Sequence, residues 1–186
     1  MSQHVPETLY HGTIFQIDRI DVSKGHGNRD FGKGFYMATS RGQAIGMMHK
    51  KYREAIVKLG GKSGQEKLSE RLYELKIDIE AVNALKVKVF EHADMEWLDF
   101  ILMCREQGGT PHDFDCVIGP TADDNTLLCL RTYWQGFYGD IGSDEAKEVL
   151  LRNLEPENLG VQCFVGRQEV ADRIVKGIVE VDWSKL

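Results

Sequence analysis

The sequence predicts a single α+β domain. Apolar and polar residues alternate over several short runs, as in half-buried strands, and apolar residues recur at helical spacing over others. The two patterns mix along the chain without the strict alternation of a parallel α/β sheet. The chain has 186 residues, 42% of them hydrophobic, and no repeat or long linker, so residues 1–186 are expected to form one domain.

The first third of the chain is expected to hold two strands and a long helix. A short strand over 8–10 ends at His11-Gly12, and a second strand over 35–38 follows a glycine-rich turn. Thr39 or Ser40 is a natural N-cap for a helix that continues at helical spacing until two glycines at 60–61 end the pattern. A polar stretch over 63–70 suggests a further short helix.

The rest of the chain alternates between short strands and amphipathic helices. Strands are expected over 72–77, 85–90, 115–120, 161–165 and 177–183. Helices are expected over 94–107, 125–137, 143–151 and 168–175.

Composition and charge narrow the class of protein. The net charge of −6 argues against a general nucleic-acid binder, because phosphate neutralisation supplies most of such affinity. No apolar run approaches the roughly 18 residues that cross a bilayer, and the first 30 residues lack the shape of a signal peptide, so we expect a cytoplasmic protein without membrane contact. The four cysteines have no Cys-x-x-Cys spacing and are expected to be buried, reduced thiols. The six histidines are too scattered to propose a metal site.

One segment is basic within this acidic chain. From Arg19 to Lys58 there are nine basic and three acidic residues, which leaves 14 basic and 26 acidic residues in the remainder. A positive segment that includes Arg29 suits an anionic ligand such as a dinucleotide. A solvated helix face around Lys50, Lys51 and Arg53 is the alternative explanation for part of it.

His11-Gly12-Thr13 form the first candidate motif. Glycine lets the backbone approach a ligand closely at a strand end, and the imidazole can form a hydrogen bond with a ribose hydroxyl. The alternative is a turn with a surface histidine.

Residues 30–40 form the second candidate motif, in which two glycines precede a strand and hydroxyl residues open the next helix. Tyr36 can offer a flat stacking surface, and Ser40 lies at a helix N-terminus, where an amide or an anion is favoured. The segment lacks the Gly-x-Gly-x-x-Gly spacing of a Rossmann loop and is not a Walker loop. The alternative is a tight turn followed by a core tyrosine.

Together the two motifs resemble the ADP-ribosyltransferase superfamily, in particular the branch shared by poly-ADP-ribose polymerases and diphtheria-type toxins. The matching residues follow the family's order: His11-Gly12-Thr13, then Gly-Lys-Gly-Phe-Tyr-Met-Ala over 32–38, then Ser40 to Ala44. The resemblance is closest to an uncharacterised bacterial family of small transferase-like proteins and covers almost the whole chain. It implies an ADP-ribosyltransferase-like fold, in which two small packed antiparallel or mixed sheets form an NAD cleft with surrounding helices.

The resemblance also implies NAD as the cofactor and a role for each matching residue. His11 would hold the adenosine ribose, backbone groups of Gly12 would hold the nicotinamide amide, and Tyr36 would line the nicotinamide pocket. The implied catalytic residues are His11, Tyr36 and Gln162. The implied cofactor contacts are His11, Gly12, Thr13, Arg29, Gly34, Phe35, Tyr36 and Ser40.

Two positions depart from the family pattern. Gln162 begins a late strand where the family usually has a Glu that stabilises the oxocarbenium-like transition state, and Gln brings no negative charge and cannot act as a base. Asp123 and Asp124 are candidates for a compensating carboxylate, with a helix cap as the alternative. Glu169 is less suitable because it lies beyond the strand. Gly46 stands where relatives often have a second aromatic residue against nicotinamide.

Three functions are compatible with these residues. The expected one is an NAD-dependent, toxin-like mono-ADP-ribosyltransferase that acts on a macromolecular acceptor, either protein or nucleic acid. An NAD glycohydrolase would use water in place of the acceptor. A catalytically silent NAD or ADP-ribose binding module is favoured by Gln162. The acceptor and the oligomeric state have no signal in the sequence.

Overall fold

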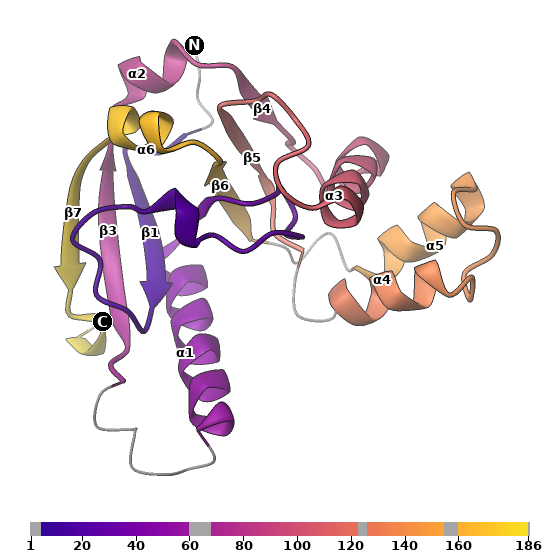
Figure 1. Ribbon diagram of the computed structural model, residues 1–186, viewed down its shortest axis with the longest axis horizontal. Helices are drawn as coiled ribbons and strands as arrows, with labels where there is room; N and C mark the ends of the chain where they lie inside the picture. Colours follow the sequence, from indigo (N-terminus) through magenta and orange to yellow (C-terminus); the bar gives the residue numbers. More distant parts are fainter. Residues whose placement is uncertain (1–4, 60–67, 123–125, 155–159, 186) are drawn as a thin grey trace.

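The computed structural model describes residues 5–59, 68–122, 126–154 and 160–185. Its strands are β1 (Thr8–Thr13), β2 (Phe35–Ala38), β3 (Arg71–Ile77), β4 (Val87–Val89), β5 (Cys116–Pro120), β6 (Val161–Val165) and β7 (Val175–Val181). They form one seven-stranded sheet in the order β4-β5-β6-β2-β1-β3-β7 (Figure 1). Only the β4–β5 pair is parallel among the neighbouring strands of this sheet. The predicted α+β class is therefore confirmed.

The described segments contain six α-helices and two 3-10 turns. They are α1 (Arg41–Lys58), α2 (Ile79–Asn83), α3 (Met95–Gln107), α4 (Thr126–Trp134), α5 (Asp144–Asn153), α6 (Gln168–Ile174), η1 (Val22–Lys24) and η4 (Trp183–Lys185). The predicted strands and most predicted helices are present with small shifts at their ends. One observed helix was not predicted: α2, a five-residue helix capped by Asp78, lies between two segments that the sequence predicts as strands. The helix expected over 63–70 lies mostly outside the described residues.

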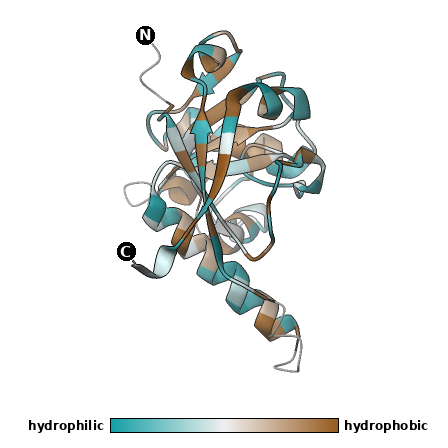
Figure 2. Ribbon diagram, turned by 90° about the vertical axis from the view of Figure 1, so that its left-hand side faces the viewer, coloured by the Kyte–Doolittle hydropathy of each residue, from teal (hydrophilic) through white to brown (hydrophobic). Residues whose placement is uncertain are grey.

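The two faces of the sheet are covered by different helices, because alternate residues of each strand point to opposite sides. On one face, residues such as Leu9, Met37 and Cys163 pack with α2, α6 and η1. On the other face, Phe164 packs with α3, α4 and α5, whereas Leu72 packs under α1. Figure 2 shows hydrophobic residues along the strands, as this arrangement requires. The second face therefore carries two separate helix groups (Figure 1).

The prediction of two packed sheets is wrong, since all seven strands belong to one hydrogen-bonded sheet. The connection between its halves is narrow, however. β1 pairs with β2 only through Tyr10 and Ala38, whereas it pairs with β3 over six residue pairs. Beyond Tyr10, the His11 side chain bonds the Tyr36 carbonyl oxygen through Nδ1, at 2.7 Å. A side chain thus satisfies a backbone group where the two strands separate.

The cysteines behave as the sequence predicts. Cys104, Cys116, Cys129 and Cys163 are buried and form no disulfide. In the described part of the chain, no helix is long and apolar enough to cross a bilayer.

Candidate functional site

A cavity of about 80 Å³ lies between α1 and the place where β1 and β2 separate. Residues from β1, β2, β6, α1 and the segment after β5 line it: Tyr10, His11, Gly12, Tyr36, Met37, Ala38, Gln43, Ala44, Met47, Lys51, Thr121 and Gln162. The fold thus brings His11-Gly12, Tyr36 and Gln162, which lie on three different strands, around one cavity.

His11 is held as a neutral imidazole. Its Nδ1–H donates to the Tyr36 carbonyl oxygen, which leaves Nε2 as a hydrogen-bond acceptor. Its ring stacks on Phe35 with the ring centroids 4.5 Å apart. Burial lowers the pKa of His11 to about 3, and the nearby Lys51 ammonium adds to this effect, against the opposing contribution of the Tyr36 carbonyl. Near neutral pH, His11 therefore carries no charge, and its Nε2 can accept a hydrogen bond from a hydroxyl.

Gly12 is required where α1 packs on β1. A Cβ at this position would overlap the Ala44 carbonyl oxygen and lie 2.9 Å from the Met48 Cβ. Close helix packing is thus a sufficient reason for glycine, beside the ligand approach that the sequence suggests. The Gly12 carbonyl oxygen accepts a hydrogen bond from Lys51 Nζ at 2.8 Å.

Tyr36 both supports the glycine-rich turn and lines the cavity. Its hydroxyl donates to the Gly32 carbonyl oxygen at 2.6 Å and accepts from the Phe31 amide at 3.1 Å. Its ring centroid lies 5.1 Å from that of Phe164. Burial, followed by the Asp30 carboxylate, raises the pKa of Tyr36 well above its ordinary value. Because the hydroxyl proton is already donated, the ring is what Tyr36 can offer to a ligand.

Gln162 is buried and held by a carboxylate that the sequence analysis missed. Its Nε2 donates to Asp30 Oδ2 at 3.0 Å, and the same oxygen accepts from the Ala122 amide at 3.1 Å. Asp30 Oδ1 accepts from Arg105 Nε at 3.0 Å, so a guanidinium neutralises this carboxylate. These bonds orient the Gln162 amide and leave its Oε1 as an acceptor. Asp30 lies at the start of the second motif, but its contact with Gln162 and Arg105 has no sequence signal, since only the fold brings these residues together.

Five of the predicted cofactor contacts lie outside the cavity lining: Thr13, Arg29, Gly34, Phe35 and Ser40. The Ser40 hydroxyl caps α1 by accepting from the Gln43 amide at 3.1 Å. Thr13 is buried, and its hydroxyl accepts from the Phe15 amide at 3.3 Å. Arg29 is exposed, but its positive charge lowers the pKa of Lys51, a lysine of α1 that lines the cavity.

Gly34 and the candidate carboxylates are also not part of the cavity lining. A Cβ at Gly34 would overlap the Val165 carbonyl oxygen, so this glycine serves the close approach of the turn to β6. Glu169 is exposed in the first turn of α6. Asp123 and Asp124 lie outside the described residues.

α1 contributes a stripe of side chains that the sequence analysis did not assign to the site. Gln43, Met47 and Lys51 lie four residues apart, which places them on one side of the helix. Gln43 Nε2 donates to Thr121 Oγ1 at 2.7 Å, whereas its Oε1 is buried without a hydrogen-bond partner among the described residues. Gly46, which stands where relatives often have a second aromatic residue, is exposed, and the neighbouring Met47 lines the cavity. The four-residue spacing itself was the available signal.

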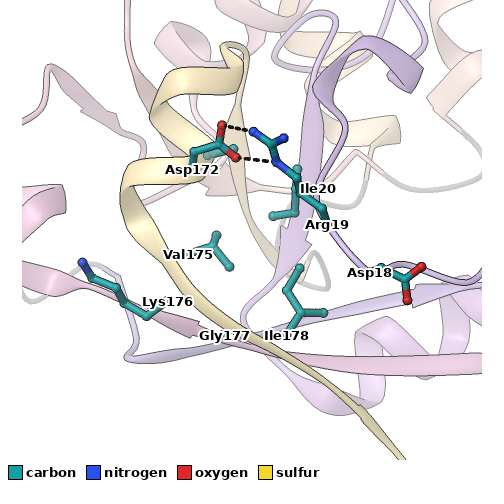
Figure 3. A pocket seen from close by; sticks show the side chains of 9 residues that line it. Asp18, Arg19, Ile20, Asp172, Val175, Lys176, Gly177 and Ile178 are labelled. Carbon is teal, nitrogen blue, oxygen red and sulfur yellow. Dashed lines mark hydrogen bonds and ion pairs between the residues drawn. The ribbon is translucent and has the colours of Figure 1, made fainter.

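A larger hollow of about 250 Å³ lies at the surface between residues 18–20, α6 and β7 (Figure 3). Arg19 pairs with Asp172 across it, with Nη2 and Oδ2 2.6 Å apart, and Lys176 pairs with Asp78. None of the residues proposed from the sequence lines this hollow. The smaller cavity is therefore the candidate site, because it gathers the motif residues.

The fold and the cavity define an α+β protein with a small cleft where a mixed sheet opens. Residues 8–175 match the model of the family described as protein of unknown function (DUF3990). Because this match covers most of the chain, the protein belongs to that family. A search of curated proteins finds no match to the chain. The family description names no activity, so function must be inferred from the cavity.

Proposed function

We propose that the protein is an NAD-dependent mono-ADP-ribosyltransferase with an ADP-ribosyltransferase-like fold. The observation that carries this proposal is the convergence of His11, Gly12, Tyr36 and Gln162 on one cavity. The family resemblance assigns NAD contacts to these four residues, and their sequence separation does not by itself bring them together.

The chemistry of the lining supports a nucleoside ligand. Neutral His11 and the Gln162 Oε1 atom can accept hydrogen bonds from ribose hydroxyls, and the Tyr36 ring can stack on nicotinamide. In the proposed reaction the bond between the pyridine nitrogen and ribose C1′ breaks, and its electron pair leaves with nicotinamide. The oxocarbenium-like sugar then bonds to a nucleophilic atom of the acceptor, which loses a proton.

Ligand binding requires the cavity to widen. Its volume of about 80 Å³ is well below the roughly 300 Å³ at which ordinary ligand pockets begin. Met47 and Lys51 are two of the long, unbranched side chains of the lining, and Met47 is the most exposed of these at 40%. Their movement on α1 is the least disruptive way to admit a pyridine ring.

A silent NAD or ADP-ribose binding module is the second candidate. None of the described residues that line the cavity carries a carboxylate. The nearest carboxylate contact of Gln162 is Asp30, which Arg105 neutralises. Positive charge developing on ribose would therefore lack its usual electrostatic partner, which favours binding without turnover.

Incubation with NAD labelled in the ADP-ribose moiety tests these functions. The protein would be mixed with a cell lysate, and the label would be followed on protein, nucleic acid and small molecules. Label on a macromolecule is the expected result for a transferase. Free ADP-ribose with nicotinamide would indicate a glycohydrolase, and saturable binding of intact NAD would indicate a binding module. Absence of both turnover and NAD binding would contradict the proposal.

A further inference from the structure

The ammonium group of Lys51 lines the candidate cleft and has no carboxylate partner in the part of the chain that the structure describes. Its Nζ donates one hydrogen bond, to the Gly12 carbonyl oxygen, at 2.8 Å. An ammonium has three donors, so two have no hydrogen-bond partner in the described segments. Within the described residues no carboxylate oxygen lies within ion-pair distance of this nitrogen. Several other lysines in the described segments do form such pairs: Lys24, Lys86, Lys88, Lys147 and Lys176.

The charged and titratable groups around Lys51 do not neutralise it. Burial is the main cause that lowers its pKa to about 8, and the Arg29 guanidinium lowers it further. Glu54, on the same helix, opposes these effects only in part. The cavity adds neutral His11 from β1 and two phenols, from Tyr10 and Tyr36. A partly buried cation among these groups is under-compensated, which is energetically unfavourable.

The α1 stripe gives the cavity a defined polarity. Gln43, at one end, has a buried carbonyl oxygen without a hydrogen-bond donor among the described residues. Met47 supplies an apolar surface in the middle, and Lys51 supplies positive charge beside Gly12 at the other end. A fitting ligand would place a donor near Gln43, a flat apolar part near Met47 and negative charge near Lys51.

We infer that Lys51 makes the Gly12 end of the cavity a recognition site for an anionic group of the ligand. The inference rests on the proposed function for the identity of that ligand, a dinucleotide. Its anionic group is then the diphosphate or a carboxylate carried by the pyridine ring. A neutral carboxamide could share the Gly12 carbonyl oxygen with Lys51, since a carbonyl oxygen has two lone pairs, but it would leave the charge of Lys51 uncompensated.

Binding of small probes to three variants tests the inference. The probes are NAD, nicotinate, nicotinamide and inorganic pyrophosphate, and affinities are measured by titration calorimetry. Lys51→Met removes the charge at similar length, Lys51→Arg keeps the charge, and Lys58→Met makes the same change at an exposed lysine of α1. Thermal melting checks that each variant is folded.

We expect Lys51→Met to weaken the binding of the probe whose anionic group contacts Lys51 by about tenfold to a hundredfold, the range of a hydrogen bond to a charged group. Nicotinamide affinity should not fall. Lys51→Arg and Lys58→Met should stay close to the wild type. Selective loss for nicotinate identifies a pyridine carboxylate, and selective loss for pyrophosphate and NAD identifies the diphosphate.

Proton uptake gives an independent readout. An anion beside Lys51 would raise its pKa, so binding at pH 8 should take up as much as about half a proton, and binding at pH 6 almost none. The uptake is obtained from calorimetry in two buffers of different ionisation enthalpy, and it should vanish in Lys51→Met.

The outcomes separate the inference from the proposed function. Binding of NAD, nicotinate and pyrophosphate that is equal in wild type and Lys51→Met, without proton uptake, overturns the inference and leaves the proposed function intact. Lys51-dependent pyrophosphate binding without any NAD binding supports the inference and overturns the proposed function. If the wild type binds none of the four probes, both are overturned.

Discussion

Gln162 and Asp30 lie within hydrogen-bond distance of each other, and this contact decides what a substitution at position 162 does. A glutamate there would place a second carboxylate beside Asp30, at about the 3.0 Å that now separates Nε2 from Oδ2. Two carboxylates this close do not both ionise readily. Replacement of the missing charge therefore also requires a change at Asp30.

We predict that Asp30→Asn combined with Gln162→Glu raises NAD cleavage by roughly tenfold or more over the wild type. Gln162→Glu alone should gain less, because its charge is suppressed by Asp30. Nicotinamide release measures the effect, and Gln135→Glu at an exposed site is the control. Equal rates in all four proteins would show that charge at position 162 does not limit the reaction.

His11 should make the stability of the protein depend on pH. The folded protein holds its pKa near 3, below the ordinary value of 6.5, so the unfolded chain binds more protons between these values. The stability that neutral His11 contributes is fully present above about pH 6.5 and is lost as pH falls toward 3. The stability difference between wild type and His11→Asn should therefore shrink between pH 7 and pH 5 in denaturant titrations. His26→Asn, at an exposed loop position, is the control; a constant difference for His11→Asn would refute the burial effect.

The sequence predicted part of the candidate site. The two motifs identify His11, Gly12 and Tyr36, because local residue order carries them. Gln162 was found through the family resemblance. Asp30 and Arg105 were missed, since their contact depends on α3 packing against the glycine-rich turn. Lys51 was attributed to a solvated helix face, although its side chain lines the cavity.

At the scale of elements, the packing of α1 on β1 depends on one glycine. Gly12→Ala should destabilise the protein by at least about 1–3 kcal/mol, because a methyl group there overlaps backbone atoms of α1. Gly46→Ala is the matched control on α1, where an added Cβ meets nothing within 4 Å. It should stabilise by roughly 0.5–1 kcal/mol through helix propensity. Similar stabilities of the two variants in urea titrations would refute the packing argument.

Elements with strong periodicity were the ones that the sequence predicted well. α1 has its Ser40 cap, and β6 is apolar at four of its five positions, so each was located correctly. The short α2 was missed because five residues hold too little of a helical pattern. The joining of all strands into one sheet was missed because it depends on a single residue pair, Tyr10 with Ala38, that no local pattern specifies.

At the scale of the whole molecule, the Asp30–Arg105 pair connects the glycine-rich turn, α3 and β6. Asp30→Ala would leave Arg105 largely buried without a counter-charge, so we expect a loss of roughly 3–5 kcal/mol in the free energy of unfolding. Adding Arg105→Met should recover much of this loss. Asp113→Ala, which breaks an exposed pair with Lys86, is the control and should change stability little. Comparable losses for Asp30→Ala and Asp113→Ala would contradict a structural role for the buried pair.

β1 and β2 are joined by a single residue pair, Tyr10 with Ala38, and we call this narrow connection within the sheet the seam. Strands β1, β3 and β7 share extensive ladders on one side of it, and β2, β6 and β5 do so on the other. Amide hydrogen exchange should therefore resolve two cooperative blocks that open with different free energies. A ligand in the cavity would contact strands of both blocks and should slow exchange in both. Uniform exchange across the sheet without a ligand would instead show that the two blocks open together as one cooperative unit. If the two blocks are observed, a bound ligand would strengthen the connection between two halves of the sheet that the chain itself joins through one residue pair.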